Sequence, residues 1–207
     1  ASPGSPNILL IILDTVRGES LSLYGYPRST TPEISRWAAG GVVFDRAFSV
    51  STHTAQGVFG TLCSFPNLPE FDGIMKHPMG NQPFRTLPTV LKESGFTTLF
   101  LYNGLYSWDN KEGFFRQQGV QRFIGRNEYV NPTFVDPDWG VCDFDVFVRA
   151  VDGFNALSKT RRPFFGFILT LSNHAPFNLP KVEGLEEITL GEEQNKRLNG
   201  IHYADWA

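Results

Sequence analysis

Several side chains able to do chemistry lie directly after apolar runs or at the start of a helical pattern. They are the carboxylate of Asp14, the hydroxyl of Thr54, the amides of Asn103 and Asn173, and the imidazole of His174. In a parallel sheet the carboxyl ends of the strands meet along one edge, and ligands bind there. A carboxylate suits a divalent cation, and a hydroxyl beside a cation or a base can attack an ester. The set therefore predicts displacement at a phosphorus or sulfur centre.

Each of these residues also has an ordinary structural explanation. Asp14 could be a turn residue or a helix cap, and Thr54 could be the N-cap of its helix. A single His174 is more often a hydrogen-bonded loop residue, and Trp108 is more often a packing residue. For Thr54 the two explanations are compatible, because a helix N-terminus presents N–H groups to an anion. The joint occurrence at strand ends favours the functional interpretation.

The elements that must position these residues alternate between two periodicities. Short apolar runs predict strands at 8–13, 42–48, 96–102, 120–124 and 164–171. Cap and stop signals around 3.6-residue patterns predict helices at 30–41, 54–64, 86–95, 107–119, 142–157 and 190–207. Strands that alternate with helices indicate an α/β fold, with a mainly parallel sheet sandwiched by helices in one domain.

Three segments carry more specific expectations. The run 8–13 is continuously apolar, which predicts a strand covered on both faces. Residues 127–140 form the longest irregular stretch and are expected to be a surface loop near the site. The segment 142–157 is amphipathic. Its apolar face is expected to hold Phe144, Phe147, Val148, Val151 and either Phe154 or Leu157.

The composition excludes several classes of protein. The 207 residues contain 18 Lys and Arg against 21 Asp and Glu, and the net charge of −3 gives no electrostatic basis for binding nucleic acid. The longest apolar run is strand-sized, well below the roughly 18 residues that a membrane span needs. Cys63 and Cys142 lie in apolar surroundings and are expected to be buried thiols rather than a disulfide framework or a metal knuckle.

The order of several stretches resembles a known family. "NILLIILDTVRGESLSLYGYPRSTTPEI" followed by "GVVFDRAFSVSTHT" is similar to the N-terminal half of the sulfatase branch of the alkaline phosphatase superfamily. The stretches "HTAQGVFGTLCSFP", "YNGLYSWDNKEGFFRQQGVQRFI", "WGVCDFDVF" and "PFFGFILTLSNHAPF" look more like the lipoteichoic acid synthase and phosphoglycerol transferase group. The resemblance covers nearly the whole chain. It implies that residues 1–207 are the N-terminal portion of a single sulfatase-like catalytic domain.

The resemblance implies a role for three of the reactive residues. Asp14 matches the first metal ligand of the family, and Thr54 matches the nucleophile, which also contacts the metal. His174 matches the histidine that contacts the phosphate. The implied cofactor is a divalent metal ion, expected to be manganese, with magnesium, calcium or zinc as alternatives.

Further residues match the substrate pocket of the family. Trp108 matches a tryptophan beside the glycerol phosphate head group, and Asp109 adjoins it. Asn103 stands where the synthases carry an aspartate, and Asn110 stands where they carry an arginine. With Asn173, we expect Trp108, Asp109 and Asn103 to contact the substrate, and the two departures leave its exact structure open.

Two other departures bear on the chemistry. Sulfatases in the strict sense convert the Cys or Ser of a C/S-x-P-x-R motif to formylglycine. The nearest match, "CSFPN" at Cys63, has its proline one place late and no arginine, so Cys63 is expected to be a core residue. Members of the superfamily complete the metal site with a later Asp-His pair, which does not occur in these 207 residues. His202 and Asp205 are expected to belong to the last helix, and the domain is expected to be incomplete.

The sequence thus predicts a metal-dependent phosphotransferase or phosphodiesterase that acts on glycerophosphate-type esters through a phospho-Thr54 intermediate. One alternative is a sulfatase-like or phosphoethanolamine-transferase enzyme, and another is a non-catalytic binding domain that lacks the metal. The expected partner is a phosphoester derived from a phospholipid or a glycan. The resemblance implies a location on the periplasmic or extracellular face of the cell envelope, with a membrane anchor outside this chain.

Overall fold

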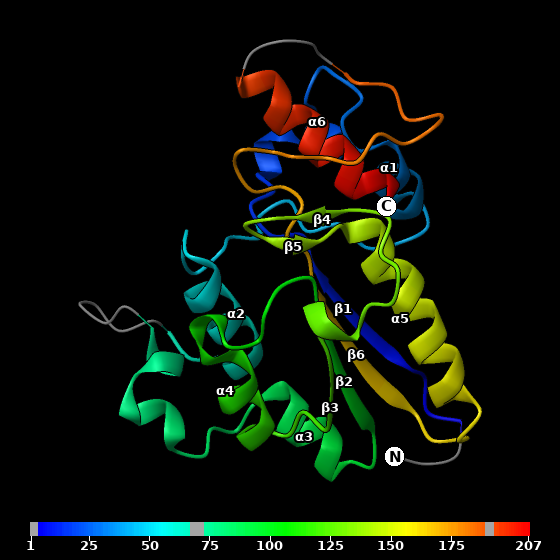
Figure 1. The fold of residues 1–207 in the computed structure, drawn as a ribbon. Helices are drawn as coiled ribbons and strands as arrows, with labels where there is room; N and C mark the ends of the chain where they lie inside the picture. The colour runs from blue at the N-terminus through cyan, green and yellow to red at the C-terminus, as the bar shows by residue number, and fades with distance from the viewer. Residues whose placement is uncertain (1–3, 67–72, 189–192) are drawn as a thin grey trace.

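The computed structural model describes residues 4–66, 73–188 and 193–207, and a parallel sheet lies between helices (Figure 1). Four strands of the described residues form this sheet in the order β1-β6-β2-β3, and all three pairings are parallel. Their bounds are Ile8–Ile12 for β1, Phe164–Leu169 for β6, Thr97–Tyr102 for β2 and Arg122–Ile124 for β3. The prediction of an α/β fold with a mainly parallel sheet is confirmed.

The helices overlap the predicted segments. They are α1 (Pro32–Ala38), α2 (Thr54–Cys63), α3 (Leu87–Glu93), α4 (Lys111–Gln117), α5 (Asp143–Ser158) and α6 (Glu193–Trp206). The predicted cap of α3 is present, because Thr86 accepts a hydrogen bond from the backbone N–H of Thr89 at 3.2 Å. The predicted loop 127–140 contains part of a small antiparallel pair, β4 (Val135–Asp136) with β5 (Gly140–Val141).

Each face of the sheet packs against its own layer of helices (Figure 1). Helices α2, α3 and α4 pack on the face that includes Phe100 and Phe167. Helix α5 packs on the opposite face, which includes Leu101 and Ile168. Successive residues of a strand point to opposite faces, so β2 and β6 supply both cores and are buried on both sides. Gly166 allows the Phe154 ring of α5 close to β6, since an added Cβ would lie 2.4 Å from that ring.

The expectation that the first strand is covered on both faces was wrong. Ile8, Leu10 and Ile12 pack against the core beside α2, but Leu9 and Ile11 remain 52% and 41% exposed. Strand β1 lies at an edge of the described sheet, and α5 contacts β2 and β6 instead. A continuous apolar run therefore did not determine coverage, because coverage depends on where the strand lies in the sheet.

The expectation of a strand at 42–48 was also wrong. This segment has no regular secondary structure, and Val42, Phe44 and Phe48 are 82%, 70% and 86% exposed. A strand needs a neighbour to satisfy its backbone groups. Among the described residues no strand pairs with 42–48, so its apolar pattern alone does not produce one.

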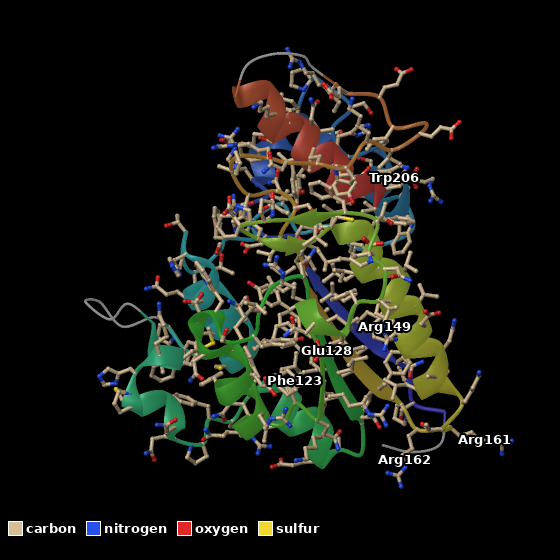
Figure 2. The ribbon with its side chains drawn as sticks, viewed as in Figure 1. Phe123, Glu128, Arg149, Arg161, Arg162 and Trp206 are labelled. Carbon is tan, nitrogen blue, oxygen red and sulfur yellow. The ribbon has the colours of Figure 1, made fainter. Side chains whose placement is uncertain are left out.

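The face that α5 buries is partly the expected one. Phe147, Phe154 and Leu157 belong to the core beside the sheet, as expected, together with Val146 and Ala150. Val148 and Val151 were expected there too but are 48% and 58% exposed. The apolar arc of this helix is wider than the stripe that meets the sheet, so periodicity left the orientation open. At the other end of the chain, the Trp206 ring of α6 stacks on Phe144 with centroids 5.4 Å apart, which joins α6 to the start of α5 (Figure 2).

The cysteines and the lengths of the helices bear on two further expectations from the sequence. Cys63 and Cys142 are both buried free thiols, as predicted. In the described part of the chain, no helix combines the length and the apolar character that a membrane span requires.

Candidate active site

The predicted site residues gather at the carboxyl edge of the sheet. Asp14 follows β1, Asn103 follows β2, and Asn173 and His174 follow β6. The three strands are parallel neighbours, so these ends lie along one edge, and Thr54 is the first residue of α2. Arg161 and Arg162, in the turn between α5 and β6, precede the start of β6 and project outward at the other end of that strand from His174 (Figure 2).

Asp14 and Thr54 are in direct contact. The Thr54 hydroxyl donates to Asp14 Oδ2 at 2.8 Å, although 40 positions separate the two residues. The N-cap position of α2 is occupied by His53, whose side chain makes no capping hydrogen bond. The explanation of Thr54 as the N-cap is therefore wrong, because its hydroxyl is directed at a carboxylate outside the helix. The N-terminus of this ten-residue helix points its backbone dipoles toward the same place.

A pair of reciprocal contacts holds the Asp14 turn against the end of β6. Asp14 Oδ1 accepts from the backbone N–H of Thr15 at 2.9 Å, and Thr15 has a φ of 58°. The Thr15 hydroxyl donates to the Asn173 carbonyl, and the Asn173 side-chain amide donates back to the Thr15 carbonyl at 2.9 Å. Asn173 is only 1% exposed. The structure thus gives Asn173 a role in joining two strand ends and does not place it in contact with solvent or substrate.

His174 faces the Asp14–Thr54 pair. Its Nε2 lies 3.6 Å from Asp14 Oδ2, and its Nδ1 lies 2.8 Å from the Leu171 carbonyl oxygen. The Trp139 ring packs on the imidazole with centroids 4.3 Å apart, and Trp139 Nε1 donates to the Ala175 carbonyl at 2.8 Å. Sequence reasoning did not assign a role to Trp139, although it lies within a stretch that resembles the family.

Trp108 lies beside Trp139 and His174, whereas Asp109 is paired with two lysines. The Trp108 side chain is 59% exposed, and its ring centroid lies 6.3 Å from that of Trp139. Asp109 is 8% exposed and forms ion pairs with Lys76 at 3.0 Å and with Lys111 at 3.3 Å. Burial alone would raise the pKa of Asp109, but the bonds and charges of the two lysines outweigh it and hold that pKa below its ordinary value. Asp109 therefore stabilises the turn that carries Trp108. Both of its carboxylate oxygens are paired with lysines, so the structure gives no basis for a direct contact between Asp109 and the substrate.

Lys111 is a further residue that the sequence did not reveal. It has no exposed surface, its Nζ lies 4.8 Å from the Tyr102 ring centroid, and the Trp108 carbonyl accepts from it at 3.3 Å. Burial lowers the pKa of Lys111, and the adjacent Asp109 carboxylate opposes that shift. A lysine in a helical pattern is ordinarily a solvated surface residue, so no sequence signal indicated this position.

Asn103 is a buried structural residue in this fold. It has no exposed surface, and its side-chain amide donates to the Val141 carbonyl at 2.7 Å and to Asp143 Oδ1 at 2.8 Å. Both amide protons are therefore used within the protein. The expectation that Asn103 contacts the substrate directly is not supported by this geometry.

The donor set at the sheet edge fits part of a divalent-cation site. Asp14 offers carboxylate oxygens and Thr54 offers a hydroxyl oxygen, which are the hard donors that such cations prefer. Across residues 4–66, 73–188 and 193–207, no group of three or more His, Cys, Asp or Glu side chains is arranged to hold a metal ion. Asp14 and Thr54 could therefore supply only some of the ligands of a divalent-cation site.

Cys63 is excluded as a nucleophile by its position. It ends α2, nine residues after Thr54, and is buried in the core beneath that helix. At about 1.5 Å of rise per residue, it lies roughly 13 Å along the helix from Thr54. Burial raises the pKa of the Cys63 thiol to about 12. The prediction that Cys63 is a core residue is confirmed.

His202 and Asp205 connect the last helix to α1 and to the residue Thr30 just before it. The Asp205 carboxylate accepts from the backbone N–H groups of Ile34 at 2.8 Å and Glu33 at 2.9 Å, so it caps α1 from a distant part of the chain. His202 Nδ1 lies 3.1 Å from the Thr30 carbonyl. The expectation that both residues serve the last helix agrees with this geometry.

The fold is thus an open, parallel α/β sheet. Its carboxyl edge carries a carboxylate–hydroxyl pair faced by an imidazole, and such a set could act on an anionic ester. Residues 6–207 match the family model described as Sulfatase. The chain therefore belongs to the sulfatase family, within the alkaline phosphatase superfamily.

Named relatives place the chain more closely within this superfamily. It is 24% identical over 193 residues to lipoteichoic acid synthase 1 of Bacillus subtilis, which covers 90% of this chain and 29% of the relative. It is 26% identical over 154 residues to phosphoglycerol transferase I of Salmonella paratyphi B, which covers 70% of this chain and 20% of the relative. The chain thus spans less than a third of the length of either curated relative.

A solved structure shows the same fold. A protein in the alkaline phosphatase superfamily from Vibrio parahaemolyticus superposes with a TM-score of 0.87 at 30% identity. The match covers 97% of this chain and 48% of the other.

Proposed function

We propose that this chain provides the nucleophile and one side of the metal site of a phosphoester transferase or phosphodiesterase. The observation that carries the proposal is the 2.8 Å contact between the Thr54 hydroxyl and Asp14 Oδ2, with His174 Nε2 3.6 Å from the same oxygen. A hydroxyl at a helix N-terminus, directed at a carboxylate and faced by an imidazole, is the arrangement that nucleophilic catalysis on an anionic ester requires.

In the proposed reaction the Thr54 oxygen attacks the phosphorus of a phosphodiester. The bond between Thr54 Oγ1 and phosphorus forms as the bond to the leaving alkoxide breaks, which leaves a phospho-Thr54 ester. The hydroxyl proton is directed at Asp14 Oδ2, the acceptor atom within hydrogen-bond reach. The released alkoxide takes up a proton from solvent. Water or a glycan hydroxyl then attacks the phosphorus, the bond between Thr54 Oγ1 and phosphorus breaks, and the proton lost by the attacking hydroxyl restores the Thr54 hydroxyl.

The other residues of the site would bind the anionic group and exclude water. His174 Nδ1 lies against the Leu171 carbonyl, and when both ring nitrogens carry a proton Nε2 is placed to donate to a phosphoryl oxygen; the N-terminus of α2 adds backbone dipoles. The Trp108 and Trp139 rings form an aromatic wall beside His174, against which the organic part of the ester can pack.

A divalent cation bound by Asp14 and Thr54 Oγ1 would favour the alkoxide and polarise a phosphoryl oxygen. We propose manganese, with magnesium, calcium and zinc as alternatives that the oxygen donors also accept. The remaining ligands would come from outside the described residues. Because two protein oxygens are too few for tight binding, the metal content of the full-length protein is a direct test of this part.

The proposed substrate is a glycerophosphate-type ester derived from a phospholipid or a glycan, handled at the periplasmic or extracellular face of the cell envelope by a membrane-anchored protein. The names of the two curated relatives support this class. Phosphoethanolamine transfer is the alternative with the same nucleophile. Sulfatase chemistry through formylglycine is disfavoured by the buried position of Cys63.

The test is Thr54→Ala in the full-length protein, with hydrolysis of a chromogenic phosphodiester as the assay. Loss of the nucleophile should reduce turnover by about 10³-fold or more. Thr61→Ala is the matched control, because Thr61 is an exposed threonine of the same helix, and it should keep wild-type turnover. Both variants should unfold within about 1 kcal/mol of wild type.

Trapping the intermediate provides the second measurement. Acid quenching during turnover, followed by mass spectrometry, should locate the phosphoester adduct on the peptide that contains Thr54. An adduct on another residue, or turnover of Thr54→Ala within a few-fold of wild type, would show that the nucleophile has been misassigned.

A further inference from the structure

Asp143 is a carboxylate without exposed surface at the start of α5. A buried charge is costly unless hydrogen bonds satisfy it. Three N–H donors converge on its Oδ1: the Asn103 side-chain amide at 2.8 Å, and the backbone N–H groups of Leu171 and Ser172, both at 3.1 Å. The Asp143 backbone N–H in turn donates to Ser172 Oγ at 2.9 Å. One side chain thus joins the ends of β2 and β6 to the start of α5.

The peptide unit of Leu171 connects Asp143 to His174. Its N–H donates to Asp143, while the carbonyl oxygen of Leu171 lies 3.2 Å from the His174 backbone nitrogen and 2.8 Å from His174 Nδ1. A carbonyl can only accept, so Nδ1 carries a proton and Nε2 is the nitrogen that faces Asp14. The orientation of the imidazole therefore depends on where the Leu171 peptide is held.

The Asn103 side of this connection is equally fixed. The Asn103 amide donates to the Val141 carbonyl at 2.7 Å, and the Val141 N–H donates to the Asn103 carbonyl at 3.1 Å. Asn103 therefore acts as a rigid donor anchored on the strand that precedes α5. Asp143 Oδ2 accepts no hydrogen bond from the described residues, so the connection passes through Oδ1 alone.

We infer that Asp143, with Asn103 as its donor, positions His174 for reaction at the phosphoryl group by fixing the turn 171–174. This inference rests on the proposed function, because that function gives His174 its contact with the phosphoryl oxygens. Asp143 touches neither Asp14 nor Thr54, so it acts through His174 and is a positioning residue. It also gives a physical reason for a buried amide at Asn103.

A double-mutant cycle in the full-length protein tests the inference. Asp143→Ala leaves three N–H donors without their acceptor, and a shifted imidazole should lower kcat by about 100-fold with KM within about threefold of wild type. In a His174→Ala background the same substitution should cost less than about threefold, because the residue it positions is already absent. Asp152→Ala is the control, since Asp152 is an exposed carboxylate of the same helix, and it should leave both backgrounds unchanged.

An equal loss in both backgrounds would show a general structural role and overturn the inference. If Asp143→Ala does not fold, Asp143→Asn replaces it, because an asparagine retains the Oδ1 acceptor and differs only at the oxygen without a partner. We expect a smaller loss for Asp143→Asn, about fivefold, that also disappears in the His174→Ala background. Additive losses in that cycle would likewise overturn the inference.

A spectroscopic measurement does not depend on activity. Nitrogen-15 spectra of labelled histidine, assigned with His174→Ala, should show His174 protonated at Nδ1 in wild type and Asp143→Asn. In Asp143→Ala the occupancy of the Nδ1 proton should fall, because the Leu171 carbonyl is no longer held beside it, and an unchanged His174 signal would overturn the inference. If wild-type protein has no transfer activity, the proposed function fails, and this spectral comparison still decides whether Asp143 orients His174.

Discussion

The two strands that bear the candidate site, β6 and β1, differ in how the rest of the fold covers them. Strand β6 lies between β1 and β2 and is buried along its whole length. Strand β1 lies at an edge, and its residues alternate between half-buried and exposed. Both strands are apolar runs of similar length, so composition does not account for the difference. Position in the sheet does, because only β6 has a strand on each side and α5 on its second face.

The same contrast extends to the chain that follows each strand. After β6, the turn to His174 is held by the buried Asp143. After β1, the chain leads through α1 to the segment 42–50, whose apolar side chains are largely exposed, and then to Thr54. Thr54, the proposed nucleophile, therefore follows a segment with largely exposed apolar side chains. His174, by contrast, follows a strand that is buried along its whole length, and its Nδ1 lies 2.8 Å from the Leu171 carbonyl oxygen.

The largest expected effect compares two isoleucines that are paired in register, Ile168 on β6 and Ile11 on β1. Ile168 is 2% exposed, so Ile168→Ala should cost about 2 to 5 kcal/mol of unfolding free energy. Ile11 is 41% exposed, and Ile11→Ala should cost about 1 kcal/mol. Urea unfolding of the two variants measures both, and equal costs would show that the two strands are covered alike.

A smaller effect is expected at the cap that joins α6 to α1. Asp205→Ala removes the acceptor of the Glu33 and Ile34 N–H groups and should cost about 1 to 2 kcal/mol. Asp152→Ala, at an exposed carboxylate of α5, serves as the control and should cost less than about 0.5 kcal/mol. Thermal unfolding distinguishes them. Equal melting temperatures for the two variants would mean that the contact between α6 and α1 does not stabilise the part of the chain that leads to the exposed segment 42–50.

The smallest effect is a pH dependence on the β6 side. Burial raises the pKa of the Asp143 carboxyl in the folded protein. In the unfolded chain the same carboxyl has a pKa of about 4, so the folded state binds the carboxyl proton more tightly. The stabilisation from protonation is complete below that pH and is lost as the pH rises through the folded-state pKa. Asp143→Asn removes this titration. The unfolding free energy of wild type should therefore fall relative to the variant as the pH rises from about 4, and a constant difference would contradict the prediction.

Much of the fold followed from local patterns. Continuous apolar runs located β1, β2 and β6, and the caps and glycines located the helices, because both signals depend on residues close in sequence. The expected strand at 42–48 and the expected burial of Val148 and Val151 on α5 were wrong for one shared reason. Pairing and orientation are decided by distant segments, on which a local pattern carries no information.

The candidate site divides in the same way. Residue types and their places after strands selected Asp14, Thr54 and His174, which the structure brings together at one edge. Asn103 and Asn173 were selected by the same signal, yet their amides are used inside the protein. Exposure separates these two groups, and exposure is a tertiary property.

By itself, the sequence determined the class of fold, the order of its elements and the presence of a carboxylate, a hydroxyl and an imidazole at the ends of adjacent strands. Only the tertiary structure decided which of those groups meet, that Lys111 and Asp143 are buried beside them, and that Trp139 packs on His174. The physical reason is that periodicity and capping are local, whereas burial and hydrogen-bond partners depend on segments such as Leu171 and Asp143 that are far apart in the chain and adjacent in space.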